Sequence, residues 1–166
     1  SCTVVGPEAP LAAGIVDRWS ALGHPCFGPS QAAAQLESSK AFSKAFMQRW
    51  NIPTARWSAF TEIDAARAYL DEFDTLPVIK ASGLAAGKGV ILPSTREEAS
   101  VALEEMMLDQ RFGDAGDEVV IEERMIGPEI SLLAICDGRT VIPLPAARDH
   151  KRLLDGDEGP NTGGMG

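Results

Sequence analysis

The spacing of apolar positions near the N-terminal end of the chain predicts a strand, a helix and a second strand. Thr3–Val5 is a short apolar run typical of a buried strand, and Glu8–Leu22 carries apolar residues at helical spacing. Gly23 is placed to end this helix, and Pro25–Phe27 is expected to form the second strand. A strand–helix–strand unit of this kind implies parallel pairing, as in an α/β fold.

The middle of the chain predicts helices and strands in alternation. The expected helices are Gln31–Leu36, Ser39–Trp50, one from Thr61 to Phe73 and one ending at Leu108. The expected strands are Arg56–Phe60, Pro77–Ala81, Val90–Leu92 and Glu118–Glu123. Two pairs with capping-box spacing are expected to begin the last two helices: Thr61 with Asp64, and either Ser94 with Glu97 or Thr95 with Glu98.

The C-terminal part predicts a hairpin followed by a loop. Glu129–Cys136 alternates between apolar and polar residues, Asp137-Gly138 suits a two-residue turn, and Arg139–Pro145 is expected to be the return strand. Beyond Pro145 the chain is polar and rich in glycine, which predicts a loop. The fold class is therefore mixed α/β (α+β), with a domain boundary between residues 30 and 40.

Composition and charge narrow the class of protein. Hydrophobic residues make up 45% of the 166 residues and charged residues 23%, which is typical of a soluble globular protein and excludes general disorder. The net charge of −9 argues against a nucleic-acid partner, and no apolar stretch is long enough to span a membrane. The three cysteines, too few and scattered for a disulfide framework, favour a reducing compartment, which we take to be the cytoplasm.

The glycine-rich segment Ala81–Gly89 is the first candidate for chemistry. Its glycines and Lys88 do not have the spacing of a Walker A loop, and it leads into a strand rather than a helix. A glycine-rich hairpin can instead fold over a triphosphate, with its amides and Lys88 as donors. A flexible, solvent-exposed hairpin is the alternative.

Lysines and acids elsewhere supply further candidates. Lys80 lies on an apolar strand directly before the glycine-rich segment, as an edge-strand charge or, more in keeping with that position, as a cation facing a pocket. Lys40 and Lys44 lie one helical turn apart, the usual pattern of a solvated face. The segment Val119–Glu129 runs from a strand into two acids and then leaves the sheet, so it can pair with an adenine edge or simply end in solvated acids.

The basic cluster Arg148–Arg152 and the glycine-rich Gly159–Gly166 suit an anionic substrate. No serine or cysteine has the context of a nucleophile, and no histidine–cysteine group has zinc spacing. The chain also starts within an apparent strand without an initiator methionine and stops within a glycine-rich loop. We therefore expect a fragment of a longer protein that is inactive alone.

Six segments in this order resemble the glycinamide ribonucleotide synthetase (phosphoribosylamine–glycine ligase) family of the ATP-grasp superfamily. They are Val5–Leu11, Ala34–Lys40, Lys80–Val90, Val120–Glu123, Asp149–Arg152 and Gly159–Gly166. The resemblance implies the tail of a Rossmann-like N-terminal domain over residues 1–36 and a truncated ATP-grasp domain over residues 37–166. It also implies that ATP phosphorylates glycine and that the amine of 5-phosphoribosylamine attacks the acyl phosphate, in the second step of purine biosynthesis.

The resemblance further implies roles for individual residues. Lys80 and Arg152 are the implied catalytic cations. The implied ATP contacts are Lys40, Lys80, Gly83, Gly87, Lys88, Gly89, Glu122, Glu123, Arg124, Met125, Glu129, Arg152 and Asn161, with Gly83–Gly89 as a mobile lid. The implied contacts to glycine and phosphoribosylamine are Glu8, Asp149, His150, Lys151, Asn161, Thr162, Gly163 and Gly164.

The chain departs from the pattern of this family at two positions. Arg148 stands where the family usually has glutamine, and Pro128 where a second acid is common. The resemblance implies Mg²⁺ or Mn²⁺ as the cofactor beside ATP, with its ligands expected beyond Gly166. The alternatives are another ATP-grasp ligase or carboxylase, and a nucleotide-binding module without turnover. The sequence predicts neither the oligomeric state nor fusion to later enzymes of the pathway.

Overall fold

The computed structural model describes residues 2–85, 87–148, 150–156 and 158–165, and it divides into two compact units, Ser1–Arg124 and Met125–Gly166. The side chains of residues 151, 152, 160, 161 and 163–165 lie outside this description. Among the described residues, no helix has the length and apolar composition needed to cross a membrane.

The first unit begins with the predicted strand–helix–strand arrangement. Strand β1 (Thr3–Val4) pairs in parallel with β2 (Cys26–Phe27), as expected. The single helix expected between them is instead two, α1 (Glu8–Ala12) and α2 (Ile15–Ala21). Gly14 interrupts them with a φ of +76°, a left-handed conformation that glycine adopts without a steric penalty.

Two helices then lead to the central sheet. Helix α3 (Gln31–Ser38) begins at Ser30, whose hydroxyl accepts a hydrogen bond from the Ala33 amide at 3.2 Å. Helix α4 (Lys40–Arg49) begins at Ser39, which accepts from the Phe42 amide in the same way. These caps satisfy amides that have no partner within the helix, and they fix where α4 starts.

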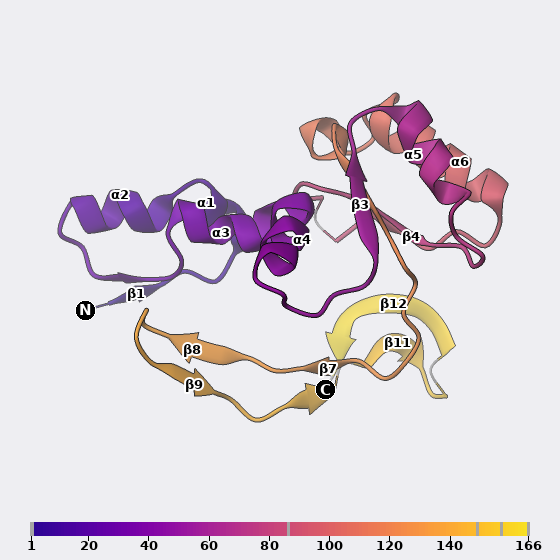
Figure 1. Ribbon diagram of the computed structural model, residues 1–166. Helices are drawn as coiled ribbons and strands as arrows, with labels where there is room; N and C mark the ends of the chain where they lie inside the picture. The colour runs from indigo at the N-terminus through magenta and orange to yellow at the C-terminus, as the bar shows by residue number, and fades with distance from the viewer. Residues whose placement is uncertain (1, 86, 149, 157, 166) are drawn as a thin grey trace. The chain divides into compact units, whose positions relative to one another are not determined.

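A four-stranded antiparallel sheet with the strand order β3-β6-β4-β5 forms the centre of this unit. Its strands are β3 (Trp57–Phe60), β4 (Val78–Ala81), β5 (Val90–Ile91) and β6 (Val119–Glu122). Helices α5 (Ile63–Leu70) and α6 (Arg96–Met107) pack against one face, and α4 contacts β3 and β6 (Figure 1). A short 3-10 helix, η1 (Gly113–Gly116), precedes β6.

Alternation along the strands separates the core from the opposite face. Ile79, Ala81, Val119 and Ile121 join residues of α5 and α6 in one buried apolar cluster. Because successive side chains of a strand point to opposite faces, Lys80 and its neighbours in β6 lie on the other side of the sheet. One face of β4 and β6 therefore stabilises the unit, and the other is available for polar groups.

The two predicted capping boxes have different outcomes. Thr95 caps α6 and accepts from the Glu98 amide at 3.1 Å, while the Glu98 carboxylate accepts from the Ser94 amide at 2.7 Å. The box predicted for Thr61 and Asp64 is wrong, because α5 starts after Glu62 with no side-chain cap. Helix α5 also stops at Leu70, before the predicted end.

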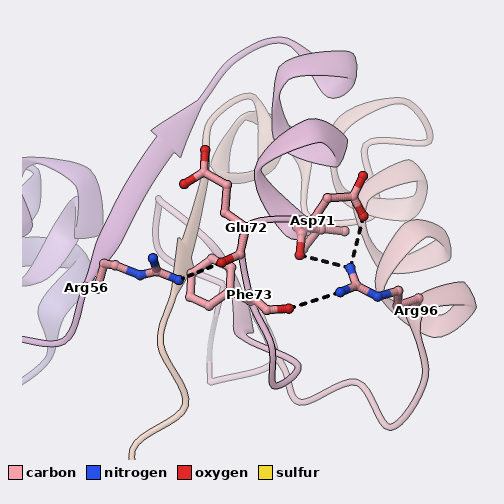
Figure 2. A network of polar contacts seen from close by, with 6 residues as sticks. Arg56, Asp71, Glu72, Phe73 and Arg96 are labelled. Carbon is pink, nitrogen blue, oxygen red and sulfur yellow. Dashed lines mark hydrogen bonds and ion pairs between the residues drawn. The ribbon is translucent and has the colours of Figure 1, made fainter.

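Arg96 ties the end of α5 to the start of α6 (Figure 2). Its guanidinium donates to the carbonyls of Leu70 and Phe73, at 3.0 Å each, and to the Asp71 carboxylate at 3.1 Å. Arg56, the residue before β3, donates to the Glu72 carbonyl, and its guanidinium carbon lies 4.2 Å from the centre of the Phe73 ring. The carbonyls at the end of α5 thus have partners, which holds both helices on the sheet.

The second unit contains only strands and their connections among its described residues. They are β7 (Ile130–Ser131), β8 (Ala134–Cys136), β9 (Val141–Pro143), β10 (Ala147–Arg148), β11 (His150–Leu154) and β12 (Glu158–Met165). Antiparallel pairs form between β7 and β10, β8 and β9, and β11 and β12.

Three sequence predictions for this second unit need correction. The strand expected over Glu129–Cys136 is interrupted between β7 and β8. The hairpin forms, but its connection takes in residues 137–140, and Asp137 accepts hydrogen bonds from the amides of Arg139 and Thr140. The glycine-rich loop expected at the C-terminal end instead pairs as β12 with β11.

Candidate functional site

A cavity of about 680 Å³ lies within the first unit, on the face of the sheet opposite the apolar core. It is bordered by α1, by the end of α3, by α4, and by β4, β5 and the segment between them. Its lining residues are Glu8, Ala9, Leu36, Glu37, Lys40, Ser43, Lys44, Lys80, Leu84, Ala85, Gly87, Gly89, Val90 and Val120. Three lysines are thus gathered beside a glycine-rich segment.

Lys80 faces this cavity from the interior of the sheet. Strand β4 is hydrogen-bonded to β6 on one side and to β5 on the other, with Lys80 opposite Val120 and Val90. The alternative that Lys80 is an edge-strand charge is therefore wrong. A cation on an interior strand needs either a counter-ion or an anionic ligand, because burial alone penalises its charge.

Lys40 joins α4 to the start of the glycine-rich segment. Its amide donates to the Ser82 carbonyl at 2.8 Å, and its ammonium donates to the Gly83 carbonyl at 3.1 Å. The Ser82 hydroxyl also accepts a hydrogen bond from the Ala41 amide at 3.1 Å. The pKa of the Lys40 ammonium lies below its ordinary value of 10.5. Partial burial is the larger cause, and repulsion from the charge of Lys80 is the smaller one.

Glu122 is a buried counter-ion rather than a solvated acid. Its side chain is 8% exposed, and its two carboxylate oxygens form ion pairs with Lys44 and with Lys80. Burial raises the pKa of Glu122, but the hydrogen bonds and charges of the two lysines outweigh burial and leave the pKa below its ordinary value of 4.5. The carboxylate is therefore ionised at neutral pH.

Lys44 is a site residue that sequence reasoning missed. The spacing of Lys40 and Lys44 is typical of a solvated helix face, yet both lysines line the cavity and the Lys44 side chain is only 12% exposed. Residues four apart share one face of a helix, so the implied pocket role of Lys40 was itself a signal for Lys44.

The glycines of the segment between β4 and β5 serve the protein's own packing as well. A Cβ on Gly83 would lie 2.7 Å from the Ala115 Cα, and one on Gly89 would lie 2.6 Å from the Ala85 Cβ. Gly87 has a φ of +75° with open space around it. Lys88 is exposed and is not one of the lining residues.

The remaining candidates divide between the two units. Glu8 lines the cavity, and Glu123 and Arg124 are exposed at the end of β6, where the Glu123 amide donates to the Arg56 carbonyl at 2.8 Å. Met125, Glu129 and His150, all exposed, and the partly buried Thr162 belong to the second unit.

The structure describes the other candidates of the second unit less fully. Asp149 lies outside the described residues. The backbones of Lys151, Arg152, Asn161, Gly163 and Gly164 lie in β11 and β12, with Arg152 opposite Asn161, while their side chains lie outside the description.

The chemistry available at the cavity is the binding of an anion. Ammonium groups and glycine-rich backbone are the groups with which proteins contact phosphates. Within the described residues, no group of three or more histidine, cysteine, aspartate or glutamate side chains could hold a metal ion.

Two protein families match this chain along its length. Residues 1–37 match the family described as phosphoribosylglycinamide synthetase, N domain, and residues 38–166 match phosphoribosylglycinamide synthetase, ATP-grasp (A) domain. The phosphoribosylamine–glycine ligase of Ralstonia nicotianae is 60% identical over 164 residues, which cover 99% of this chain and 39% of that protein. The trifunctional purine biosynthetic protein adenosine-3 of Gallus gallus is 59% identical, over 98% of this chain and 16% of that protein.

A solved structure agrees with these matches. The crystal structure of phosphoribosylamine–glycine ligase from Thermotoga maritima superposes with a TM-score of 0.86 at 36% identity, covering 99% of this chain and 40% of that one. This chain thus spans less than half the length of each of these relatives. The predicted fold class, a small parallel α/β part followed by ATP-grasp structure, is confirmed. Because the ATP-grasp match alone takes in most of its residues, the chain belongs to the phosphoribosylglycinamide synthetase family.

Proposed function

We propose that this chain is part of an ATP-dependent ligase that joins glycine to 5-phosphoribosylamine, giving glycinamide ribonucleotide, ADP and phosphate. The observation that carries the proposal is the cavity in which Lys40 and Lys80 lie beside the glycine-rich segment Gly83–Gly89. Membership of the phosphoribosylglycinamide synthetase family supports this reaction, and the lysines and glycines of the cavity support binding of the triphosphate there.

The proposed chemistry has two steps. A carboxylate oxygen of glycine attacks the γ-phosphorus of ATP, and the bond to ADP breaks, which leaves an acyl phosphate. The amine of phosphoribosylamine then attacks the acyl carbon, loses a proton, and releases phosphate. Phosphoryl transfer depends mainly on positioning and charge stabilisation, so cations and backbone amides suffice and no protein nucleophile is needed.

Within this scheme most of the proposed ATP contacts belong to the first unit. Lys40 and Lys80 contact its phosphates, and the segment around Gly83, Gly87, Lys88 and Gly89 covers them. The hinge Glu122, Glu123, Arg124 and Met125 pairs with adenine, and Glu129 accepts hydrogen bonds from the ribose. Arg152 and Asn161 complete the contacts near the phosphates.

The amino acid and amine substrates contact other residues in this proposal. They are Glu8, Asp149, His150, Lys151, Asn161, Thr162, Gly163 and Gly164. Mg²⁺ or Mn²⁺ as a cofactor, a domain boundary between residues 36 and 37, and a cytoplasmic location are part of the same proposal.

The decisive assay uses the complete gene product with ATP, Mg²⁺, glycine and freshly prepared phosphoribosylamine, and it follows ADP and glycinamide ribonucleotide together. We expect ADP to form only when both glycine and the amine are present, in a one-to-one ratio with the ligated product. ADP formation with a different acid or amine instead would point to another ATP-grasp ligase. Nucleotide binding without turnover would point to a non-catalytic module.

A further inference from the structure

Glu122 is held between two lysines that come from different parts of the fold. Lys44 approaches from α4 and pairs with Oε2, while Lys80 approaches from β4 and pairs with Oε1. One carboxylate cannot neutralise two ammonium groups, so this Lys44–Glu122–Lys80 cluster keeps a net positive charge. That surplus charge lies at the wall of the cavity, because both lysines line it.

The two lysines are held to different degrees. Lys44 also donates to the Thr54 hydroxyl at 2.7 Å, and its side chain is 12% exposed. The Lys80 side chain is 25% exposed, and Glu122 is its ion-pair partner among the described residues. Lys44 is thus fixed at two points, whereas Lys80 has a single anchor and more access to the cavity.

A phosphate contact by Lys80 therefore depends on what happens to Glu122. If the Lys80 ammonium turns toward a ligand in the cavity, it withdraws from the carboxylate. A buried carboxylate without a counter-ion is strongly unfavourable, and this penalty would oppose the movement. A second lysine already bound to the other oxygen removes most of the penalty.

We propose that Lys44 is a positioning residue for nucleotide binding: it keeps the buried Glu122 carboxylate paired, so that Lys80 is free to contact the phosphates. This inference rests on the proposed function, since it takes ATP to be the ligand of the cavity. It assigns to Lys44 an effect that reaches the nucleotide only through Glu122 and Lys80.

The alternative is a purely structural ion pair that fastens α4 to β6. The two roles predict different kinetics. Breaking a purely structural pair lowers the amount of folded enzyme. The apparent kcat then falls, while the KM values for ATP and glycine stay the same. A positioning lysine, when removed, leaves Lys80 as the sole partner of Glu122, and the KM for ATP rises while the KM for glycine does not.

The test is steady-state kinetics of the complete gene product carrying Lys44→Met, which keeps the apolar stem and removes the charge. We expect the KM for ATP to rise about tenfold or more, the lower end of what a charge-assisted phosphate contact contributes. The KM for glycine should stay within about twofold, the scatter typical of a substitution that touches no glycine contact. Lys44→Arg should retain most of the affinity for ATP, because it keeps the charge next to Glu122.

Adding Lys44→Met to a Glu122→Gln variant distinguishes an effect through Glu122 from a direct contact between Lys44 and ATP. In Glu122→Gln the carboxylate charge is gone, so Lys80 no longer has to compensate it. We expect Lys44→Met to change the KM for ATP by less than about twofold when added to Glu122→Gln, which is the non-additivity of a coupled pair. This double variant lacks the uncompensated buried charge, so the comparison holds even if Lys44→Met alone does not fold.

Controls distinguish failure of the inference from failure of the proposed function. Arg49→Met, an exposed cation on the same helix, should leave both KM values unchanged. If Lys80→Met impairs ATP use but Lys44→Met does not, the nucleotide site stands and the inference about Lys44 is overturned. The inference about Lys44 is also overturned if Lys44→Met raises the KM for ATP tenfold when it is added to Glu122→Gln. If Lys80→Met has no effect on ATP, the site assignment itself fails.

Discussion

The ammonium of Lys40 donates a hydrogen bond to the carbonyl of Gly83 across 3.1 Å, from the first residue of α4 to the start of the glycine-rich segment. The same lysine is partly buried and lies close enough to Lys80 for their charges to repel. A phosphate bound between them would relieve this repulsion. Binding of such a phosphate would therefore be coupled to binding of a proton at Lys40.

We expect ATP binding to take up protons at alkaline pH. In the free protein, burial and the charge of Lys80 lower the pKa of Lys40 below 10.5, and an anion beside the ammonium raises it again. Between these two pKa values the complex holds more protons than the free protein, and well below both the uptake vanishes. Calorimetry of the complete gene product in buffers of different ionisation enthalpy measures this uptake.

Lys40→Arg is the matched control for the proton uptake. The guanidinium keeps the positive charge but does not titrate in this range, so ATP should still bind while uptake disappears. Uptake of the same size in Lys40→Arg would assign the proton to another group.

Lys80→Met should impair the use of ATP far more than that of glycine. Lys80 lines the cavity from an interior strand, and a charge-assisted contact to phosphate contributes about 1.5–3 kcal/mol, or roughly ten- to a hundredfold. The measurement is kcat/KM for each substrate in the complete gene product. An unchanged kcat/KM for ATP would contradict a phosphate contact by this residue.

The sequence predicts the alternation on which this site depends. Pro77–Lys80 is apolar except for its last residue, and the structure shows why: Ile79 faces the helices and Lys80 faces the cavity. The cap at Thr95 also follows from local chemistry, because Thr95 and Glu98 have capping-box spacing. Both features are encoded within a few neighbouring residues, whereas the parallel pairing of β1 with β2 follows from the strand–helix–strand order.

The features that sequence analysis missed depend on residues distant in the chain. Nothing near Glu122 indicates that Lys44, on a helix far earlier in the sequence, will compensate its charge. The break between α1 and α2 depends on the left-handed conformation of Gly14, which the spacing of apolar residues does not predict. Likewise, pairing with β11 turns the glycine-rich end into a strand, although its composition favours a loop.

Gly83→Ala should loosen the start of the glycine-rich segment. A Cβ at this position would lie 2.7 Å from the Ala115 Cα, which is backbone and cannot move aside without shifting η1. Overpacking of this kind typically costs about 1–3 kcal/mol. Hydrogen exchange in the complete gene product should show faster exchange at the Gly83 amide, which donates to the Ala115 carbonyl at 3.1 Å.

Gly6→Ala is the control for Gly83→Ala. No atom lies within 4 Å of a Cβ built on Gly6, and its φ is not in the left-handed region. Its exchange pattern around residues 82–83 should match that of the unmodified protein. Equal exchange at Gly83 in Gly83→Ala and in the parent would show that the contact with Ala115 does not hold the segment.

Glu122→Gln should lower stability at neutral pH and remove part of its acid dependence. The unfolded chain has the ordinary carboxyl pKa of 4.5, whereas Lys44 and Lys80 hold the folded value lower despite burial. The folded protein therefore binds fewer protons between these two values. Glu122 contributes its full stabilisation above pH 4.5, and that contribution is lost as the pH falls through the lowered value.

The measurement is the thermal unfolding midpoint of the complete gene product, taken from neutral pH downward, for the parent, Glu122→Gln and Glu123→Gln. Removing the carboxylate leaves two lysines at the cavity wall without their counter-ion, which should cost about 1–3 kcal/mol at neutral pH. Because protonation of Glu122 removes the same charge in the parent, the gap between the two midpoints should narrow as the pH falls. Glu123 is exposed and lies outside the Lys44–Glu122–Lys80 cluster, so Glu123→Gln should follow the parent throughout. A gap for Glu122→Gln that stays constant down to acid would mean that the carboxylate acts through its shape and hydrogen bonds, and that its charge does not stabilise the fold.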